Sequence, residues 1–560
     1  MERARMNSAY WLNTAWMWKC HAELRRFQRA THAVAQAQAQ VLRQIVLQNR
    51  NSEFGRTHDF AEIRAPGDFQ QRVSLATYDD FRPAIGRLAN DCRGNPCGCP
   101  NQADRGFLTE QEVLLLEPTS GSSGGEKLIP YTAPLRAEFQ CGIDAWIADL
   151  MASYPDVRQG RAYWSISPAL GPSRKTPSGI PIGFDDDTAY LGVAECWAMK
   201  RLLAVPPELA KVSDLEEFRY QTLLHLLAAD DLVLISIWSP TFLTALLSQL
   251  DSGAERLCAD LHAALATNKT GRQERADEVA VILSANQSPT WKLRRIWPRL
   301  ALISCWADGA SARYAKELQQ LFRHVAIQPK GLLATEAFVS FPLAGRKGAV
   351  LALRSHFFEF LDAHGEMKLA HQLEEGGYYQ VVVTTGGGLY RYRLGDMVEV
   401  VGFENQCPLL RFVGRADRVS DLVGEKLDEM HVRAVLDQVF ARHGVAPSFS
   451  MLVPVDNGVR RYRLYLQGIV LTAGQIRHLT EEIETGFDGN PYYRYAVRIG
   501  QLSRLQVRVL PPSAASAWSL YERECLTRGQ KLGDIKPTVM HNWPGWAERF
   551  EALTPSVAPK

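Results

Sequence analysis

The segment Thr119–Lys127, TSGSSGGEK, has the residue types of a loop that grips phosphate. Glycines let the backbone bend around an anion so that its N–H groups point inward, while hydroxyls and the lysine add donors and positive charge. The candidate phosphate-binding residues are Thr119, Ser120, Gly121, Ser122, Ser123, Gly124, Gly125 and Lys127. A Gly/Ser run is also typical of a flexible linker. This one stands between the apolar Leu114–Leu116 and LIPYT, where a linker is not expected.

A P-loop NTPase is the first alternative for such a loop. That class requires GxxxxGK followed by serine or threonine, because this hydroxyl binds the magnesium ion. Here Glu126 precedes Lys127 and Leu128 follows it. The P-loop interpretation fails at both positions, so the loop is expected to belong to another kind of nucleotide site.

Further candidate segments follow in chain order: GLLATEAFVSFPL, LYRYRLGDMVEV, RFVGRADRVSDLV and GQKLGDIKP. Their candidate residues are Thr335, Glu336, Arg393, Asp396, Arg415, Asp417, Lys531 and Lys536. Together with TSGSSGGEK, and in this order, the segments resemble the signatures of the adenylate-forming superfamily. That superfamily comprises acyl-CoA synthetases, peptide-synthetase adenylation domains and luciferases. The departure from its pattern is Glu126, which replaces the usual proline.

The resemblance implies a role in ATP binding for each motif. Thr335 contacts the nucleotide, and Glu336 holds Mg²⁺, a hard ion that takes one or two carboxylates plus phosphate oxygens. Asp396 accepts hydrogen bonds from both ribose hydroxyls, which its two oxygens allow. Arg415 contacts the nucleotide at a hinge between a large and a small domain.

A lysine near the C-terminus assists adenylation in the superfamily. Lys536 is the preferred candidate, and Lys531 stays an alternative because GQK also resembles the pattern. The expected catalytic residues are therefore Lys536, Lys127 and Arg415. Transfer of AMP to a carboxylate is an in-line displacement at phosphorus, which depends on positioning and on neutralising charge.

Other segments narrow the resemblance to the Gretchen Hagen-type acyl acid–amido synthetases. They include NSEFGRTHDF, IWPRLALISCWADGASARYAKEL and YYRYAVRIGQL, and with the motifs above they extend from residue 51 to residue 537. The resemblance implies an AMP-forming ligase that uses ATP and Mg²⁺, converts a carboxylic acid into an acyl adenylate, and transfers the acyl group to an amine or amino acid. Two alternatives stay open. One is an acyl-CoA or acyl-carrier-protein ligase, and the other is a non-catalytic relative that binds a small ligand.

Recognition of the acid is less well marked. Trp238, Ser239 and Trp306 are candidate acyl-binding residues on position alone, because acids in this fold tend to lie at strand ends beside the nucleotide. Trp238 and Trp306 each close an apolar strand, where aromatic side chains often belong to the core. The residues do not distinguish one acid or one amine from another.

The composition, 46% apolar and 22% charged over 560 residues, is that of a globular chain with several cores. A net charge of +2 gives no reason to expect a nucleic-acid partner. No apolar run approaches the ~18 residues that span a membrane, and Met1–Phe27 lacks a secretory signal. We therefore expect a cytoplasmic enzyme with small-molecule partners and no obligate protein partner. Cys92, Cys97 and Cys99 lack a fourth zinc ligand and are expected in a surface loop.

The predicted elements favour an α/β fold. Residues 20–50, rich in Ala, Leu, Gln and Arg, predict one helix. The order of apolar strand and then helix recurs at 232–250 and 300–325, which is typical of a parallel or mixed sheet covered by helices. Residues 345–414 predict antiparallel or barrel-like strands. The resemblance implies an adenylate-forming, luciferase-like fold, with an ATP- and acyl-binding domain at 1–417 and a mobile α+β lid domain at 418–560.

Overall fold

The computed structural model describes residues 8–90, 106–119, 126–165, 168, 174–183, 201–266, 273–512 and 514–553. The predicted loop that carries Cys92, Cys97 and Cys99 lies outside these residues. The chain divides into two compact units, Met1–Phe412 and Val413–Lys560. The predicted boundary after Asp417 lies a few residues beyond this division. Within the described part of the chain, no helix combines the length and the apolar character needed to cross a membrane.

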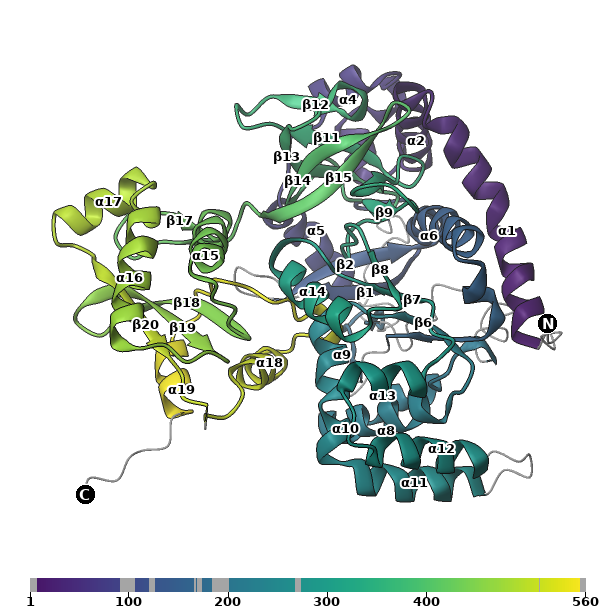
Figure 1. Ribbon diagram of the computed structural model, residues 1–560. Coiled ribbons are helices and arrows are strands. Elements are labelled where there is room, and N and C mark those ends of the chain that lie inside the picture. Colours follow the sequence, from purple (N-terminus) through teal and green to yellow (C-terminus); the bar gives the residue numbers. More distant parts are fainter. Residues whose placement is uncertain are drawn as a thin grey trace. The chain divides into compact units, whose positions relative to one another are not determined.

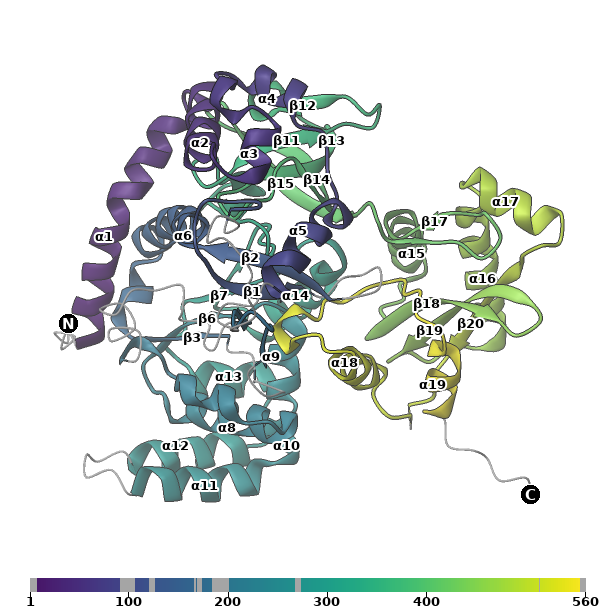
Figure 2. The ribbon, with the colours of Figure 1, turned by 180° about the vertical axis from the view of Figure 1, so that it is seen from behind.

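The single helix expected over residues 20–50 is wrong, because the chain forms α1 (Ser8–Ala30) and α2 (Val34–Gln48) with a break between them. The reason is tertiary. The backbone N–H of Gln406 donates to the carbonyl of Thr31 at 2.9 Å, and the amide of Asn405 donates to its hydroxyl at 2.8 Å. In a continuous helix the backbone carbonyl of Thr31 would accept a hydrogen bond from a later residue of the same helix. Here it accepts one from Gln406 instead. Figure 2 shows α1 running beside α6 (Ala133–Ser153).

Further helices among the described residues of the first unit are short or of medium length. They are α3 (Glu53–Thr57), α4 (Pro66–Arg72), α5 (Tyr78–Asn90), α8 (Leu215–Ala228), α9 (Pro240–Leu247), α10 (Gln249–Ser252), α11 (Ala254–Ala266), α12 (Gln273–Ser284), α13 (Pro289–Ile296) and α14 (Ala312–Leu321). Helices α8 and α10 to α13 form one cluster, visible at the bottom of Figure 1.

A four-stranded parallel sheet lies at the centre of the predicted strand-and-helix repeats. Its strands are β3 (Arg161–Trp164), β6 (Leu232–Ser236), β7 (Leu302–Cys305) and β8 (Ala326–Pro329), in the order β3-β6-β7-β8. Helix α9 follows β6 and helix α14 follows β7, which confirms the predicted order. Strands β6 and β7 are buried throughout, as expected for parallel strands covered on both faces.

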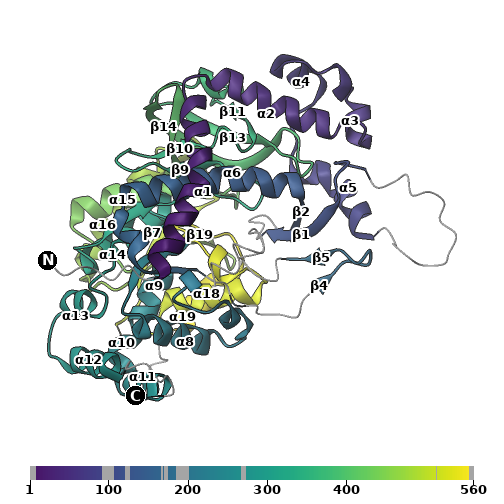
Figure 3. The same ribbon diagram turned by 90° about the vertical axis from the view of Figure 1, so that its right-hand side faces the viewer.

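A second sheet carries the Gly/Ser segment. It has the order β2-β1-β5-β4 and contains β1 (Val113–Thr119), β2 (Lys127–Thr132), β4 (Arg174–Lys175) and β5 (Pro181–Ile182). Strands β1 and β2 are antiparallel, and β5 pairs with β1 in parallel. In Figure 3 this sheet lies beside α5.

The predicted antiparallel region is confirmed as a seven-stranded sheet with the order β12-β11-β13-β14-β15-β10-β9. Its strands are β9 (Ser340–Pro342), β10 (Ala349–Leu351), β11 (Phe357–Leu361), β12 (Met367–Leu369), β13 (Tyr378–Thr384), β14 (Tyr392–Glu404) and β15 (Cys407–Arg415). One continuous apolar core joins this sheet to α1, α2 and α6.

The second unit has the predicted α+β alternation. Its strands are β16 (Val419–Ser420), β17 (Leu427–Asp428), β18 (Phe449–Asp456), β19 (Arg460–Gln467) and β20 (Ser503–Val509), of which the last three form a sheet. Its helices are α15 (Glu429–His443), α16 (Ala473–Phe487), α17 (Pro491–Arg498), α18 (Ala517–Thr527) and α19 (Trp546–Ala552). Helices α15 and α16 contact each other and share a core with the sheet.

Candidate active site

The ends of the Gly/Ser segment lie side by side in the β1–β2 hairpin. Thr119, the last residue of β1, is the antiparallel partner of Lys127, the first residue of β2. The segment therefore connects two paired strands, which an interdomain linker does not do. It also differs from a P-loop, because a strand follows the lysine and the next helix begins only at Ala133. The predicted positions Ser120 to Gly125 lie outside the described residues.

Lys127 lies beside a tyrosine that also holds the start of β2. Its Nζ is 5.7 Å from the centre of the Tyr78 ring. The Tyr78 hydroxyl accepts a hydrogen bond of 2.7 Å from the backbone N–H of Leu128. Burial raises the pKa of Tyr78. Glu126, the departure from the superfamily pattern, forms an ion pair with Arg174 of β4.

Two tyrosines connect the second predicted motif to strand β2 and to the third motif. The hydroxyl of Tyr131, on β2, donates to the backbone carbonyl of Thr335 at 2.6 Å. The hydroxyl of Tyr392, at the start of β14, donates to Oε1 of Glu336 at 3.2 Å. The Glu336 side chain is buried. The strand after the Gly/Ser segment, the Thr335–Glu336 pair and the strand that carries the third motif therefore meet at one place in the first unit.

Asp396 stands in an irregular part of β14. The pairing of β13 with β14 shifts register between Gln380 and Val382, opposite Gly395 and Asp396. Gly395 has φ +87°, a left-handed conformation that glycine adopts without steric cost. Such bulges redirect side chains and are frequent beside active sites. Asp396 is buried at this bulge.

The segment that leads into Asp396 is held by buried charge. Nε of Arg391 lies 3.0 Å from Oε2 of Glu359 on β11, and both side chains are almost fully buried. Arg391 also donates to the backbone carbonyl of Val73 at 2.7 Å. Arg393, which the sequence analysis placed in the third motif, does not share this pair. Its guanidinium donates to the side-chain oxygen of Gln380 on β13.

Arg415 and the C-terminal lysines belong to the second unit. Arg415 binds Asp417 through two hydrogen bonds of 2.8 Å. The carbonyl of Lys536 accepts a hydrogen bond of 3.1 Å from the Tyr521 hydroxyl. Lys531 directly precedes a short 3₁₀ helix, Leu532–Asp534.

The chain just beyond Lys536 is tied to the residues that follow Arg415. The hydroxyl of Thr538 donates to Oε1 of Glu429. Oε2 of the same carboxylate forms an ion pair of 3.0 Å with Arg418. Within the second unit, these bonds hold the backbone near Lys536 in a defined place beside the segment that carries Arg418.

The two predicted tryptophans meet at the carboxyl ends of β6 and β7. The backbone N–H of Trp306 donates to the carbonyl of Trp238 at 2.8 Å, and the ring centres are 5.8 Å apart. Both side chains are partly exposed, so neither is simply core. Ser239 is buried beside them, but its hydroxyl already shares a hydrogen bond of 2.6 Å with Thr241.

A lysine that the sequence interpretation missed lies among the tryptophans. Nζ of Lys330 donates to Oγ of Ser236 at 2.7 Å. It also lies 5.0 Å from the ring centres of Trp146 and Trp238 and 5.9 Å from that of Trp164. Burial lowers the pKa of Lys330 to about 7. Its position in the sequence could have revealed it. Lys330 directly follows strand β8, just as the predicted tryptophans follow β6 and β7.

A row of buried polar side chains crosses the sheet beside Lys330. Ser236, Ser304 and Gln328 are register neighbours on β6, β7 and β8. The side-chain carbonyl of Gln328 accepts from Nε1 of Trp146 at 3.1 Å. Among the described residues, Nε2 of Gln328 and Oγ of Ser304 have no hydrogen-bond partner. This edge of the sheet therefore combines aromatic walls, an amine and unused polar atoms, which suits a small molecule with both apolar and polar parts.

Solved structures define the class of fold. A 2-hydroxyisobutyryl-CoA ligase in the postadenylation state has a TM-score of 0.50 at 12% identity, covering 93% of this chain and 91% of that one. An acyl acid amido synthetase, AtGH3.15 in complex with 2,4-DB, has a TM-score of 0.80 at 21% identity, with 96% of each chain covered. The predicted adenylate-forming fold is confirmed.

Sequence patterns identify the family. The GH3 family N-terminal domain matches residues 23–327, and the GH3 family central domain matches residues 349–415. The chain therefore belongs to the GH3 family, as the resemblance predicted. It is 26% identical to the indole-3-acetic acid-amido synthetase GH3.17 of Arabidopsis thaliana, with 74% of each chain covered. It is 25% identical to the probable indole-3-acetic acid-amido synthetase GH3.4 of Oryza sativa subsp. japonica, with 77% of this chain and 72% of the relative covered.

Proposed function

We propose that this protein is an ATP-dependent acyl acid–amido synthetase. It adenylates a carboxylic acid, releases pyrophosphate, and then transfers the acyl group to an amine, which we propose is an amino acid. The observation that supports this most directly is the pair of hydrogen bonds from Tyr131 and Tyr392, which hold Thr335 and Glu336 beside β2, the strand after the Gly/Ser segment, and beside the third motif. The names of the GH3 relatives support the amide product.

In the first half-reaction, a carboxylate oxygen of the acid attacks the α-phosphorus of ATP and pyrophosphate leaves. Lys127 and the backbone amides of its loop would neutralise the β- and γ-phosphates as charge builds on the leaving group. Thr335 would contact the nucleotide, and Asp396 would bind the two ribose hydroxyls. The carboxylate of Glu336 suits a hard cation and is oriented by the Tyr392 hydroxyl. Glu336 would hold Mg²⁺, which when bound neutralises phosphate oxygens.

The second unit would complete the site for adenylation. We propose that Lys536 bridges the acyl carboxylate and the α-phosphate, and that Arg415 contacts the nucleotide from the hinge. Rotation of the lid domain would then withdraw Lys536 and admit the amine. A neutral amine attacks the acyl carbon, the bond to AMP breaks, and the amine loses a proton. No covalent intermediate on the enzyme is needed.

The acid would bind at the carboxyl edge of the parallel sheet. Trp238 and Trp306 offer partly exposed aromatic faces there, and Lys330 offers a hydrogen-bond donor. Ser239 lies at the same edge, although its hydroxyl is engaged with Thr241. The cytoplasmic location expected from the sequence stays a prediction.

The test is acid-dependent pyrophosphate release from ATP, screened over aryl and alkyl acids. Lys127→Ala should lower release at least a hundredfold, about the cost of losing one preorganised polar contact to the reacting group. Asp396→Asn should lower release by raising KM for ATP, because the amide has one acceptor oxygen for two ribose hydroxyls. Lys347→Ala, on an exposed loop, is the matched control and should retain activity. Near-normal release in both site variants would refute the assignment. If the wild type released no pyrophosphate with any acid, the result would favour a non-catalytic relative that binds a small ligand.

The acceptor is tested with the best acid, offered with amino acids, simple amines and coenzyme A. An amide product that requires an amine supports the proposal, whereas a thioester formed in preference would favour an acyl-CoA ligase. The pyrophosphate-release assay decides between the two lysines. Lys536→Ala should abolish adenylation while Lys531→Ala leaves it, and the reverse result would move the role to Lys531.

A further inference from the structure

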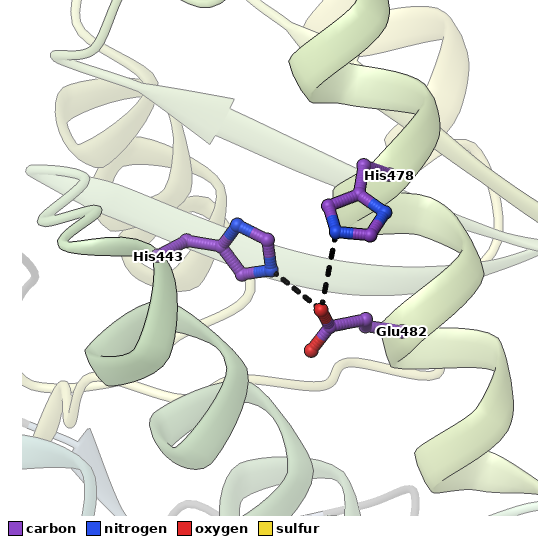
Figure 4. Close-up of side chains that lie close together, drawn as sticks. All are labelled: His443, His478 and Glu482. Atoms are coloured by element: carbon purple, nitrogen blue, oxygen red, sulfur yellow. Dashed lines mark ion pairs between the residues drawn. The ribbon is translucent and has the colours of Figure 1, made fainter.

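Two histidines and a glutamate of the second unit direct their metal-binding atoms toward one point. His443 is the last residue of α15, and His478 and Glu482 lie one turn apart on α16. Nε2 of His443 lies 3.0 Å and Nε2 of His478 lies 3.5 Å from the same oxygen, Oε1 of Glu482. Figure 4 shows both rings pointing at that oxygen. All three donor atoms lie within 4.8 Å of one another.

The two nitrogen–oxygen separations are close to those of a coordination shell. Zinc binds imidazole nitrogen and carboxylate oxygen at about 2.0–2.2 Å in tetrahedral sites, which puts neighbouring donor atoms about 3.4 Å apart. The two measured nitrogen–oxygen distances lie on either side of this value. A cation between the three atoms would require only small side-chain adjustments, and it would replace the contacts that the side chains now make with one another.

The backbone positions of the three residues are set by packing and not by the cluster. Residues four apart on a helix share one face, which places His478 and Glu482 together. Helices α15 and α16 approach closely, since a Cβ at Gly486 of α16 would come within 2.4 Å of Val435 on α15. Gly444, in a left-handed conformation, ends α15 directly after His443. The helices therefore present the donors before any cation arrives.

Arg442 is the one neighbouring cation that contacts the cluster among the described residues. Its Nη1 lies 2.6 Å from Oε2 of Glu482, the oxygen that does not face the histidines. The carboxylate thus uses one oxygen for Arg442 and presents the other to both imidazoles. The Arg442 side chain is more than half exposed, so it can move into solvent when a second positive charge approaches.

We propose that His443, His478 and Glu482 form a binding site for a transition-metal cation of the zinc class. Two imidazole nitrogens and one carboxylate oxygen suit Zn²⁺ and its neighbours and not Mg²⁺ or Ca²⁺, which prefer oxygen ligands. Water would fill the fourth position, because the site lies at the surface. The cation would connect the end of α15 to the middle of α16 and stabilise the second unit. This site is separate from Glu336, which lies in the first unit.

The test is titration of the full chain with Zn²⁺ after treatment with a chelator, followed by calorimetry and by thermal unfolding. We expect one saturable equivalent and a rise in the unfolding temperature of the second unit. His478→Ala, at an exposed position, and Glu482→Gln should each weaken binding at least tenfold, since even partners outside the coordination shell are worth that much. His364→Ala, an exposed histidine of the first unit, is the matched control and should bind as the wild type does.

A second variant distinguishes zinc bound at the proposed site from zinc bound elsewhere in the chain. Replacement of Cys92, Cys97 and Cys99 by serine should leave the titration unchanged. Loss of binding in that variant, or binding that survives His478→Ala, would overturn the proposal, as would the absence of saturable binding. Each readout is independent of adenylation, so failure of the proposed function would leave this result unaffected.

Discussion

Replacing Lys330 by methionine should change how stability depends on pH. Burial lowers the pKa of this amine from 10.5 to about 7 in the folded protein. The unfolded chain keeps the ordinary lysine pKa, so between about pH 7 and pH 10.5 the unfolded state binds more protons than the folded state. The free energy of unfolding of the wild type therefore rises with pH across this interval. The destabilising effect of the buried ammonium is complete below about pH 7.

The size of the effect follows from the two pKa values. Their difference corresponds to about 5 kcal/mol across the whole interval. The unfolded amine is still mostly protonated at about pH 10, so about 4 kcal/mol of this change lies between about pH 6 and pH 10.

The assay compares denaturant unfolding of the wild type and Lys330→Met at a series of pH values. Subtraction of the two free energies cancels the other titrating groups, which both proteins share. The difference should move in favour of the wild type by about 4 kcal/mol between about pH 6 and pH 10. Lys347→Met, at an exposed lysine, should show no such movement. A difference for Lys330→Met that stays constant with pH would refute the reasoning.

Two further predictions concern the residues that hold the third motif. Glu359→Gln should lower the free energy of unfolding by about 3 kcal/mol, because it leaves the buried guanidinium of Arg391 without its carboxylate; an unchanged denaturation midpoint would contradict this. Tyr392→Phe should lower kcat for pyrophosphate release about tenfold with little change in KM for the acid, since a hydrogen bond to the carboxylate of Glu336 is lost. Tyr378→Phe, at an exposed position of the same sheet, is the control, and equal rates for both variants would mean that other groups orient Glu336.

Local sequence was sufficient for much of the architecture. The helix at 473–487 and the strands around it follow from short-range periodicity, which hydrophobic burial on one face imposes directly. Alternating strand and helix signals between residues 232 and 325 were enough to predict a parallel sheet, because parallel strands need a crossover element. The family followed from motif order, since each motif is a contiguous segment.

The sequence analysis failed where a tertiary contact overrides local helix propensity, as in the single helix predicted over residues 20–50. Residues 31–33 contain no glycine or proline, so nothing local marks a helix break. Hydrogen bonds from Asn405 and Gln406, distant along the chain, decide it.

The chemistry shows the same division. Residue types predicted a phosphate loop, and the family resemblance implied a carboxylate for a cation and a carboxylate for ribose. Only the folded chain joined Tyr131 to Thr335, or surrounded Lys330 with three tryptophans. Only the packing of α15 against α16 brought His443 to the pair His478 and Glu482. A motif within one segment can be recognised because its spacing is covalent, whereas a site assembled from separate elements depends on packing, which the sequence encodes only through the whole fold.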